Sequence, residues 1–311
     1  MRMTRINYQI CLLWGVMTAL ASCTQAELQE NNPVQNPCTE PVSLQIGNAG
    51  LSTVVSRATL NTNGEQIGIF VKEDSEYQVV SNRLYTYNQS KTLWETDNAV
   101  LLRTPIATLG AYYPWKSNRT QPLPMKCQEY STAEDISAVP FTADNLNHTV
   151  NLALNHIYSR LVVTFVKATG NKAYHGEAKV TDFSLDGTGV NDEAFFDLFT
   201  GKHLMIADKP IQFTKLDYQA DNATKKTMDC LIVPATLDGT LTFGATVDTK
   251  PMEGTVDAAT LCGSGKKLEA GKQYKLTITV NPTGLEVSSL QVVDWDVIKI
   301  NDSTDPFKPE K

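Results

Sequence analysis

The sequence predicts an all-β protein in the β-sandwich style, and three observations support this prediction. Short segments such as Leu241–Asp248 and Tyr274–Val280 alternate apolar and polar residues, and this period of two is typical of strands with one buried face. Turn-forming pairs such as Asp186-Gly187 separate these segments. The sequence has no long apolar period of 3.6 residues, so we expect helices to be minor.

The composition predicts a folded, acidic protein. Hydrophobic residues make up 41% of the 311 residues and charged residues 20%, which is enough apolar material for a buried core. Lys and Arg number 27 against 34 Asp and Glu, a net charge of −7. This balance argues against a nucleic-acid partner, because nucleic-acid-binding proteins normally present a basic surface. The four His residues are scattered, so we predict no metal and no cofactor.

Residues 1–22 have the features of an export signal, because two arginines precede an apolar stretch over residues 10–21. Leu20-Ala21-Ser22-Cys23 looks like a bacterial lipobox, in which the signal is cut before the Cys and its thiol is acylated. The sequence therefore predicts a lipoprotein signal peptide over 1–22 and lipidation of Cys23. An ordinary signal peptide followed by an incidental Cys is the alternative.

Residues 23–41 follow as a polar segment with three prolines. Such a composition cannot pack a core, so we predict a lipidated tether that holds the folded body off a membrane.

Predicted strands follow one another from residue 42 onward. In chain order the clearest are Val42–Ile46, Ile67–Lys72, Arg83–Tyr87, Ile106–Trp115, Leu161–Val166, Leu241–Val247 and Tyr274–Val280. The strands are too many for one ordinary sandwich, so we place a boundary at the polar break Ala168–Lys172. This gives an N-terminal β-sandwich domain over 42–170 and a C-terminal one over 171–311.

Motifs of catalytic chemistry are absent from the sequence, which contains neither G-x-S-x-G nor H-E-x-x-H. Gly263–Lys267 superficially suggests a phosphate-binding loop, but position 260 is Thr and Lys267 stands where Ser or Thr is needed. A glycine-rich turn explains this segment better, and we predict that the protein is not an enzyme.

Tyr112, Tyr113 and Trp115 lie in one aromatic segment around Pro114. They could form a stacking platform for a glycan or a contact for a peptide. Alternatively, they cap the core at the end of a strand, where Pro114 stops the hydrogen-bond ladder.

Four Cys follow the lipid anchor, namely Cys38, Cys127, Cys230 and Cys262. Export permits disulfides, and a Cys230–Cys262 pair would lie within one predicted domain. Other pairings and buried free thiols stay open, since spacing alone cannot choose among them.

The run Leu268–Val280, followed by Gly284–Val287 and Asp294-Trp295, resembles the fimbrillin family, the type V pilins of Gram-negative gut and oral anaerobes. Members typically open a strand with L-x-A-G-x-x-Y and end on a short aliphatic–x–Asp–Trp segment. Tyr112–Trp115, the Asn155–Phe165 strand and Cys230–Pro234 fit the family pattern in the same order.

The resemblance implies two tandem transthyretin-like β-sandwich domains and export as a lipoprotein. Stalk subunits of the family are cut by a trypsin-like protease after an Arg near their first strand, which opens a groove that a strand of the next subunit fills. Arg57, followed by Ala58, is the best candidate here, because no other Arg or Lys occurs from 24 to 71. An ordinary strand Arg that points to water is the alternative.

Residues after Trp295 include Val297, Ile298 and Ile300, which could act as a donor strand, although they do not alternate cleanly. Tip and accessory subunits of such pili lack a usable donor. The place of this subunit as stalk, tip or anchor therefore stays open.

Together these observations predict a structural or adhesive subunit of a cell-surface fimbria. Its expected partners are other fimbrial subunits, the outer membrane through the lipid anchor, and a receptor on a host or bacterial surface. The expected location is the outer membrane as a lipoprotein and then the surface fimbria. The alternative is a non-polymerising surface lipoprotein that binds glycan or peptide.

Overall fold

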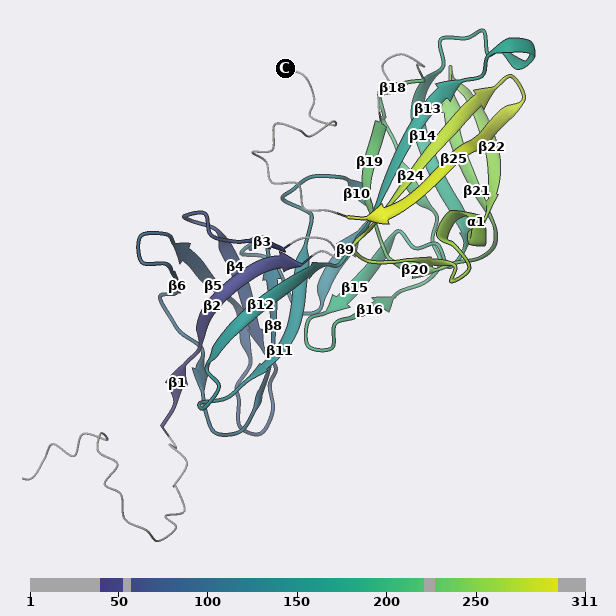
Figure 1. Ribbon diagram of the computed structural model, residues 1–311. Coiled ribbons are helices and arrows are strands. Elements are labelled where there is room, and N and C mark those ends of the chain that lie inside the picture. The colour runs from purple at the N-terminus through teal and green to yellow at the C-terminus, as the bar shows by residue number, and fades with distance from the viewer. Residues whose placement is uncertain (1–39, 53–56, 221–226, 296–311) are drawn as a thin grey trace, which may run out of the picture. The chain divides into compact units, whose positions relative to one another are not determined.

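The computed structural model describes residues 40–52, 57–220 and 227–295, and the regular secondary structure in these ranges is nearly all β-strand (Figure 1). The helical elements described are the single turn α1 (Ala258–Cys262) and the 3-10 turn η1 (Gly170–Lys172). The predicted all-β class is therefore confirmed.

Residues 45–156 contain all the strands of an eight-stranded sheet. Its order is β3-β2-β12-β11-β8-β4-β5-β6. The bounds are β2 (Gln45–Ser52), β3 (Arg57–Thr59), β4 (Gln66–Val71), β5 (Val80–Asn88), β6 (Leu93–Glu95), β8 (Ala107–Tyr113), β11 (Ser137–Ala143) and β12 (Thr149–His156). A short pair, β1 (Val42–Ser43) and β7 (Leu101–Leu102), lies beside it. β2 and β6 contact each other although they are far apart in the sheet order, so the sheet folds back on itself around a buried core.

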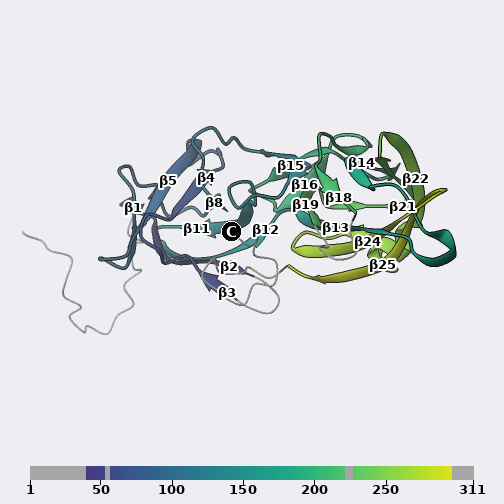
Figure 2. The same cartoon turned by 90° about the horizontal axis from the view of Figure 1, so that it is seen from above.

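Two five-stranded sheets form the second part of the fold (Figure 2). One has the order β10-β19-β13-β24-β25, with β10 (Gln128–Glu129), β13 (Ser159–Lys167), β19 (Thr227–Ile232), β24 (Lys272–Asn281) and β25 (Gly284–Asp294). The other contains β14 (Lys179–Thr188), β17 (Ile211–Phe213), β18 (Tyr218–Gln219), β21 (Asp238–Val247) and β22 (Lys250–Asp257). Shorter pairings join β9 (Leu123–Lys126), β15 (Glu193–Asp197) and β16 (Lys202–Met205), and β20 (Ala235–Thr236) with β23 (Lys267–Leu268).

Alternating side chains fill the space between these two sheets. In β24, Tyr274, Leu276, Ile278 and Val280 are all buried, as their period of two predicts. Across the interface, the rings of Phe165 on β13 and Phe183 on β14 meet edge to face with centroids 6.1 Å apart. The inner faces of the two sheets therefore form one sandwich core.

The strand pairing does not follow the predicted boundary at Ala168–Lys172. β13 pairs with β19 and β24 of the later sheet, and β10 pairs with β19. β9 likewise pairs with β15. A single cut at the polar break would leave these three strands on the wrong side, because the chain enters the second sheet system before β11 and β12 complete the first. The division into domains 42–170 and 171–311 stays a prediction.

No helix among the described residues is both long and apolar enough to cross a membrane.

Candidate functional site

β2 is inserted between two strands at one border of the eight-stranded sheet. It runs parallel to β12, with Gln45 beside Thr149 and Leu51 beside Leu154, and antiparallel to β3. The register with β12 shifts near Gly47, where the Asn48 backbone N–H donates to Asn151 Oδ1 at 3.0 Å. Figure 1 shows β2 between β3 and β12.

The buried side chains of this first segment belong to the N-terminal core. Leu44, Ile46, Ala49 and Leu51 are each at most 9% exposed and pack in the same cluster as Leu154. Burial of one large aliphatic side chain is worth about 1.5–3 kcal/mol, against a total stability of about 5–15 kcal/mol for a typical domain. Loss of β2 would therefore leave an open strand edge on β12 above an apolar socket, and such an edge strongly favours pairing with another strand.

Arg57 and Ala58 are the first two residues of β3, the outermost strand of this sheet. Ser52 pairs with Arg57 and Leu51 with Ala58. A cut between Arg57 and Ala58 would separate β1, β2 and Arg57 from the rest of the chain, which would keep Ala58 and Thr59 of β3. The assignment of these residues as a maturation site stays a prediction.

Two other predicted sites lie outside the described residues. These are the lipidation site Cys23 and the donor-strand residues Val297, Ile298 and Ile300.

Trp295 ends the described part of the C-terminal segment in a buried aromatic cluster. Its indole is 2% exposed and stacks on the His156 imidazole, with ring centroids 4.1 Å apart and an angle of 3°. Its backbone N–H donates to the Gly271 carbonyl at 2.8 Å. The Tyr130 ring meets the indole at 6.0 Å. These contacts fix the chain at Trp295, the last described residue.

Charged groups surround this cluster. His156 Nδ1 lies 2.8 Å from Asp135 Oδ1, whereas His156 Nε2 is buried without a hydrogen-bond partner. The Arg160 guanidinium lies 4.1 Å from the centre of the Tyr130 ring and donates from Nε to Asp229 at 2.8 Å. Burial raises the pKa of Tyr130 to about 12. No sequence pattern predicted a site at His156, and the Asp294-Trp295 motif was the signal that pointed to this cluster.

The aromatic segment is divided between two cores. Tyr112 is fully buried, so its predicted role as a ligand contact is wrong, because β8 turns this side chain inward. Its hydroxyl donates to Asn82 Oδ1 at 2.7 Å, and burial raises its pKa to about 12. Tyr113 and Trp115 are half-buried and pack against different clusters. For these two residues, ligand contact stays a prediction.

The described cysteines are free thiols, so the Cys230–Cys262 disulfide is not formed in this structure. Cys127 Sγ instead contacts the Asn191 carbonyl at 3.4 Å and accepts from the Val233 backbone N–H at 3.3 Å. Burial raises the pKa of all three described thiols, which favours the protonated thiol over the nucleophilic thiolate at neutral pH.

Metal binding has no support within residues 40–52, 57–220 and 227–295, where no three His, Cys, Asp or Glu side chains converge. The predicted absence of a metal therefore stays a prediction for the whole chain.

The fold and the inserted first strand define a sandwich-type, all-β protein whose N-terminal segment completes a sheet. Residues 53–295 match the model of the fimbrillin-like family, and the chain belongs to this family. The resemblance drawn from the sequence motifs is thereby confirmed.

Solved structures with the same fold include two candidate cell adhesion proteins. The one from Bacteroides uniformis is 18% identical, with a TM-score of 0.53 over 82% of this chain and 99% of its own. The one from Bacteroides ovatus is 14% identical, with a TM-score of 0.54 over 84% of this chain and 100% of its own. No curated protein sequence matches this chain significantly.

Proposed function

We propose that this protein is a structural or adhesive subunit of a cell-surface fimbria. It is exported as a lipoprotein through Cys23, reaches the outer membrane, and assembles with other subunits by strand exchange after proteolysis at Arg57. Membership of the fimbrillin-like family supports the fimbrial role, and the adhesion named for two proteins of the same fold agrees with it. This function needs no catalytic residues and no cofactor.

The observation that carries this proposal is the position of β2. It precedes Arg57 in the chain and pairs in parallel with β12. Ile46 and Leu51 of β2, together with Leu44 just before it, are buried in the core. Removal of β2 creates a socket of matching shape, and a strand of a second copy can fill it by β-augmentation. The free energy of assembly then comes from burying the donor side chains and from pairing the donor backbone.

The donor is the second half of the proposal. Val297, Ile298 and Ile300 follow Trp295 with only Asp296 between Trp295 and Val297, so the anchored indole would present them at a fixed starting point. A subunit with a working donor can extend a stalk, whereas one without it can only end a fibre.

Protease treatment of the lipid-free precursor tests the assembly step. A trypsin-like protease is expected to produce a new N-terminus at Ala58 and a ladder of multimers on an unboiled denaturing gel. The Arg57→Ala variant should stay uncut and monomeric, whereas Arg103→Ala, which changes an exposed Arg elsewhere, should behave as the wild type. A wild-type chain that is cut elsewhere, or not at all, contradicts the role of Arg57.

A second variant separates cleavage from donation. Replacement of Ile298 and Ile300 by Asp should permit cleavage but prevent the ladder, since charged side chains cannot fill apolar sockets. An unchanged ladder would place the donor elsewhere in the chain. Clean cleavage of the wild type without a ladder would favour a tip or anchor subunit, or the non-polymerising surface lipoprotein.

A further inference from the structure

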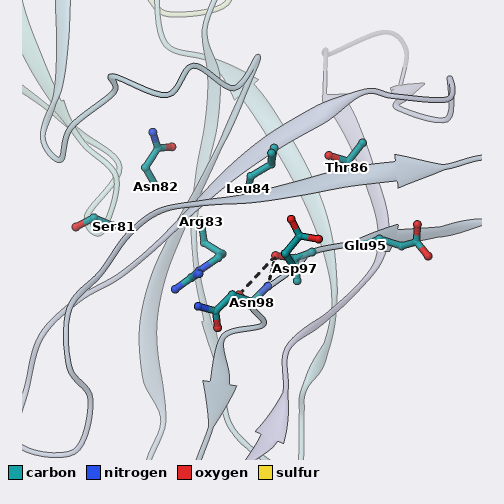
Figure 3. Close-up of a pocket in the computed structure, with 9 residues that line it drawn as sticks. Ser81, Asn82, Arg83, Leu84, Thr86, Glu95, Asp97 and Asn98 are labelled. Carbon is teal, nitrogen blue, oxygen red and sulfur yellow. Dashed lines mark hydrogen bonds between the residues drawn. The ribbon is translucent and has the colours of Figure 1, made fainter.

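A polar cavity of about 660 Å³ opens between β5 and the segment after β6 (Figure 3). β5 pairs with β4 along most of its length, but with β6 only from Thr86 to Asn88. The chain after Glu95 diverges from β5 and leaves a gap beside the first half of that strand. The gap is lined mainly by polar side chains, including Ser81, Asn82, Arg83, Thr86, Thr96 and Asn98.

Arg83 is the one Arg or Lys that lines this cavity. Its Nε is buried and has no hydrogen-bond partner, and no ion pair to Arg83 exists among the described residues. A guanidinium carries five N–H donors and stays charged at all relevant pH values. Arg83 itself is half-exposed, so its remaining N–H groups can form charge-assisted hydrogen bonds to an anionic group in the cavity. Figure 3 shows its side chain directed toward Asn98.

The two acids of the cavity do not satisfy Arg83. Glu95 is engaged by Lys91 at 2.5 Å and by Asn88 Nδ2 at 2.7 Å. Asp97 is exposed at the mouth and makes no ion pair within the described part of the chain. Their charges still disfavour a ligand with several negative charges, such as a phosphate.

Asn82 fixes one wall of the cavity. Its backbone has φ of +51°, a conformation that Asn tolerates better than most residues. Its side chain donates to the Lys116 carbonyl at 2.8 Å and accepts from the Tyr112 hydroxyl at 2.7 Å. Tyr112 and the Lys116 backbone therefore hold Asn82 in place. A side chain held in this way keeps its position when a ligand binds, which lowers the entropic cost of binding.

The geometry points to this cavity as a binding site for the carboxylate of an acidic sugar residue. The Arg83 fork matches a carboxylate in a bidentate arrangement, and the Ser, Thr and Asn side chains suit the sugar hydroxyls. The volume falls in the range of small-molecule sites. Such a site would allow the subunit to bind a receptor. The proposal does not depend on whether the subunit polymerises.

Titration of the uncleaved, lipid-free chain with N-acetylneuraminic acid and with glucuronic acid tests the proposal, and N-acetylglucosamine serves as the uncharged control. Binding is followed by saturation-transfer NMR and calorimetry. We expect at least one acid to bind and the uncharged sugar to bind at least tenfold more weakly. The preferred acid identifies the source, which is a sialylated glycan or a uronate-containing polysaccharide.

Variants assign the binding to Arg83. Arg83→Gln should weaken acid binding at least tenfold, and Arg83→Lys should weaken it less, because the charge stays but the fork is lost. Arg103→Gln, the same charge change at an exposed Arg, should leave binding unchanged. Should Arg83→Gln fail to fold, Asn98→Leu at the exposed mouth is expected to reduce binding without disturbing the core.

Three outcomes overturn the proposal: neither acid binds, the uncharged sugar binds equally well, or Arg83→Gln and Asn98→Leu both bind as the wild type does. If a peptide with a free C-terminal carboxylate bound this cavity more strongly than the acidic sugars do, the assignment of a saccharide ligand would also be wrong. The protein is measured before cleavage, so these outcomes are independent of the protease and ladder experiments.

Discussion

At the scale of single residues, Asp248 organises the turn between β21 and β22. Its carboxylate accepts hydrogen bonds from the backbone N–H groups of Ala178 at 2.9 Å and Lys179 at 2.8 Å, and from the Tyr174 hydroxyl at 2.9 Å. Burial opposes its ionisation, but these hydrogen bonds outweigh burial and lower the pKa of Asp248. Its own backbone is in the left-handed region, with φ of +45°, which Asp tolerates in turns.

Asp248→Ala is expected to lower the free energy of unfolding by about 1–3 kcal/mol, because the buried Ala178 N–H loses its partner. Asp248→Asn should cost less, since it keeps one acceptor oxygen and tolerates the same backbone. Urea unfolding at pH 7 measures both. The matched control is Asp217→Ala. The Asp217 side chain is 89% exposed, so its removal should lower the free energy of unfolding by less than about 1 kcal/mol. Equal effects of Asp248→Ala and Asp217→Ala would refute the turn argument.

His203 makes stability depend on pH. Burial lowers its pKa below the usual 6.5, although the hydrogen bond from Nε2 to the Ile157 carbonyl at 2.7 Å opposes this shift. The folded state therefore prefers the neutral ring. The contribution of this ring to the free energy of unfolding is complete above pH 6.5, the ordinary pKa, and is lost as the pH falls through the pKa of the folded state. His203→Gln, which keeps a donor, should show a smaller fall in the urea midpoint between pH 7 and pH 5.5 than the wild type. An identical fall in both proteins would contradict this assignment.

Sequence patterns determine some side-chain environments better than others. Alternation correctly predicts that Tyr274 and Leu276 face the core. It cannot say which of Tyr112 and Tyr113 is buried, because β8 is covered on both faces by different clusters. Arg83 gives no signal in the sequence, since its importance depends on the divergence of the segment after β6.

At the scale of elements, all of the predicted strands are present. Ile67–Lys72 is largely β4, Arg83–Tyr87 lies within β5, and Leu161–Val166 lies within β13. Their partners could not be predicted, because the parallel pairs β2–β12 and β13–β24 join segments more than ninety residues apart. Such pairings depend on the whole hydrophobic core and not on local pattern.

The first strand gives the sharpest prediction at this scale. A chain that begins at Ala58 should be less stable than the precursor, and it should bind a hydrophobic dye at the uncovered socket. A synthetic peptide of residues 42–52, added in trans, should restore stability by pairing with β12. The same peptide with Ile46 and Leu51 replaced by Asp is the control, because it cannot fill the sockets. Unchanged stability of the shortened chain would show that β2 does not complete the core.

At the scale of the whole molecule, the two buried clusters and the sheets do not divide at one point in the sequence. β9 and β10 pair with later strands before β11 and β12 return to the eight-stranded sheet. Polar breaks mark where the chain turns, but they do not show which sheet receives the next strand. The predicted boundary at Ala168–Lys172 could therefore identify a true turn, at η1, without locating the change of sheet.

Trp295 connects these parts, because it follows β25 and stacks on His156 at the end of β12. Trp295→Ala removes a fully buried aromatic side chain, so we expect it to lower the free energy of unfolding by about 3–5 kcal/mol. Trp295→Phe should lose less, since it keeps a ring against the imidazole. Val292→Ala, at a position of the same strand that is 43% exposed, should change stability by less than about 0.5 kcal/mol.

Local opening tests whether Trp295 anchors the C-terminal segment or only fills volume. In Trp295→Ala, amide hydrogen exchange should accelerate first at the end of β25, where Val293 and Asp294 pair with Gln273 and Lys272, and should exceed the increase that global destabilisation produces. Acceleration spread evenly over all strands would assign Trp295 a packing role alone. If the end of β25 opens first, the donor residues proposed from Val297 onward would no longer start from a fixed position. The variant should then be cut at Arg57 normally and form shorter ladders than the wild type, which connects the stability of one stacked pair to the length of the fibre.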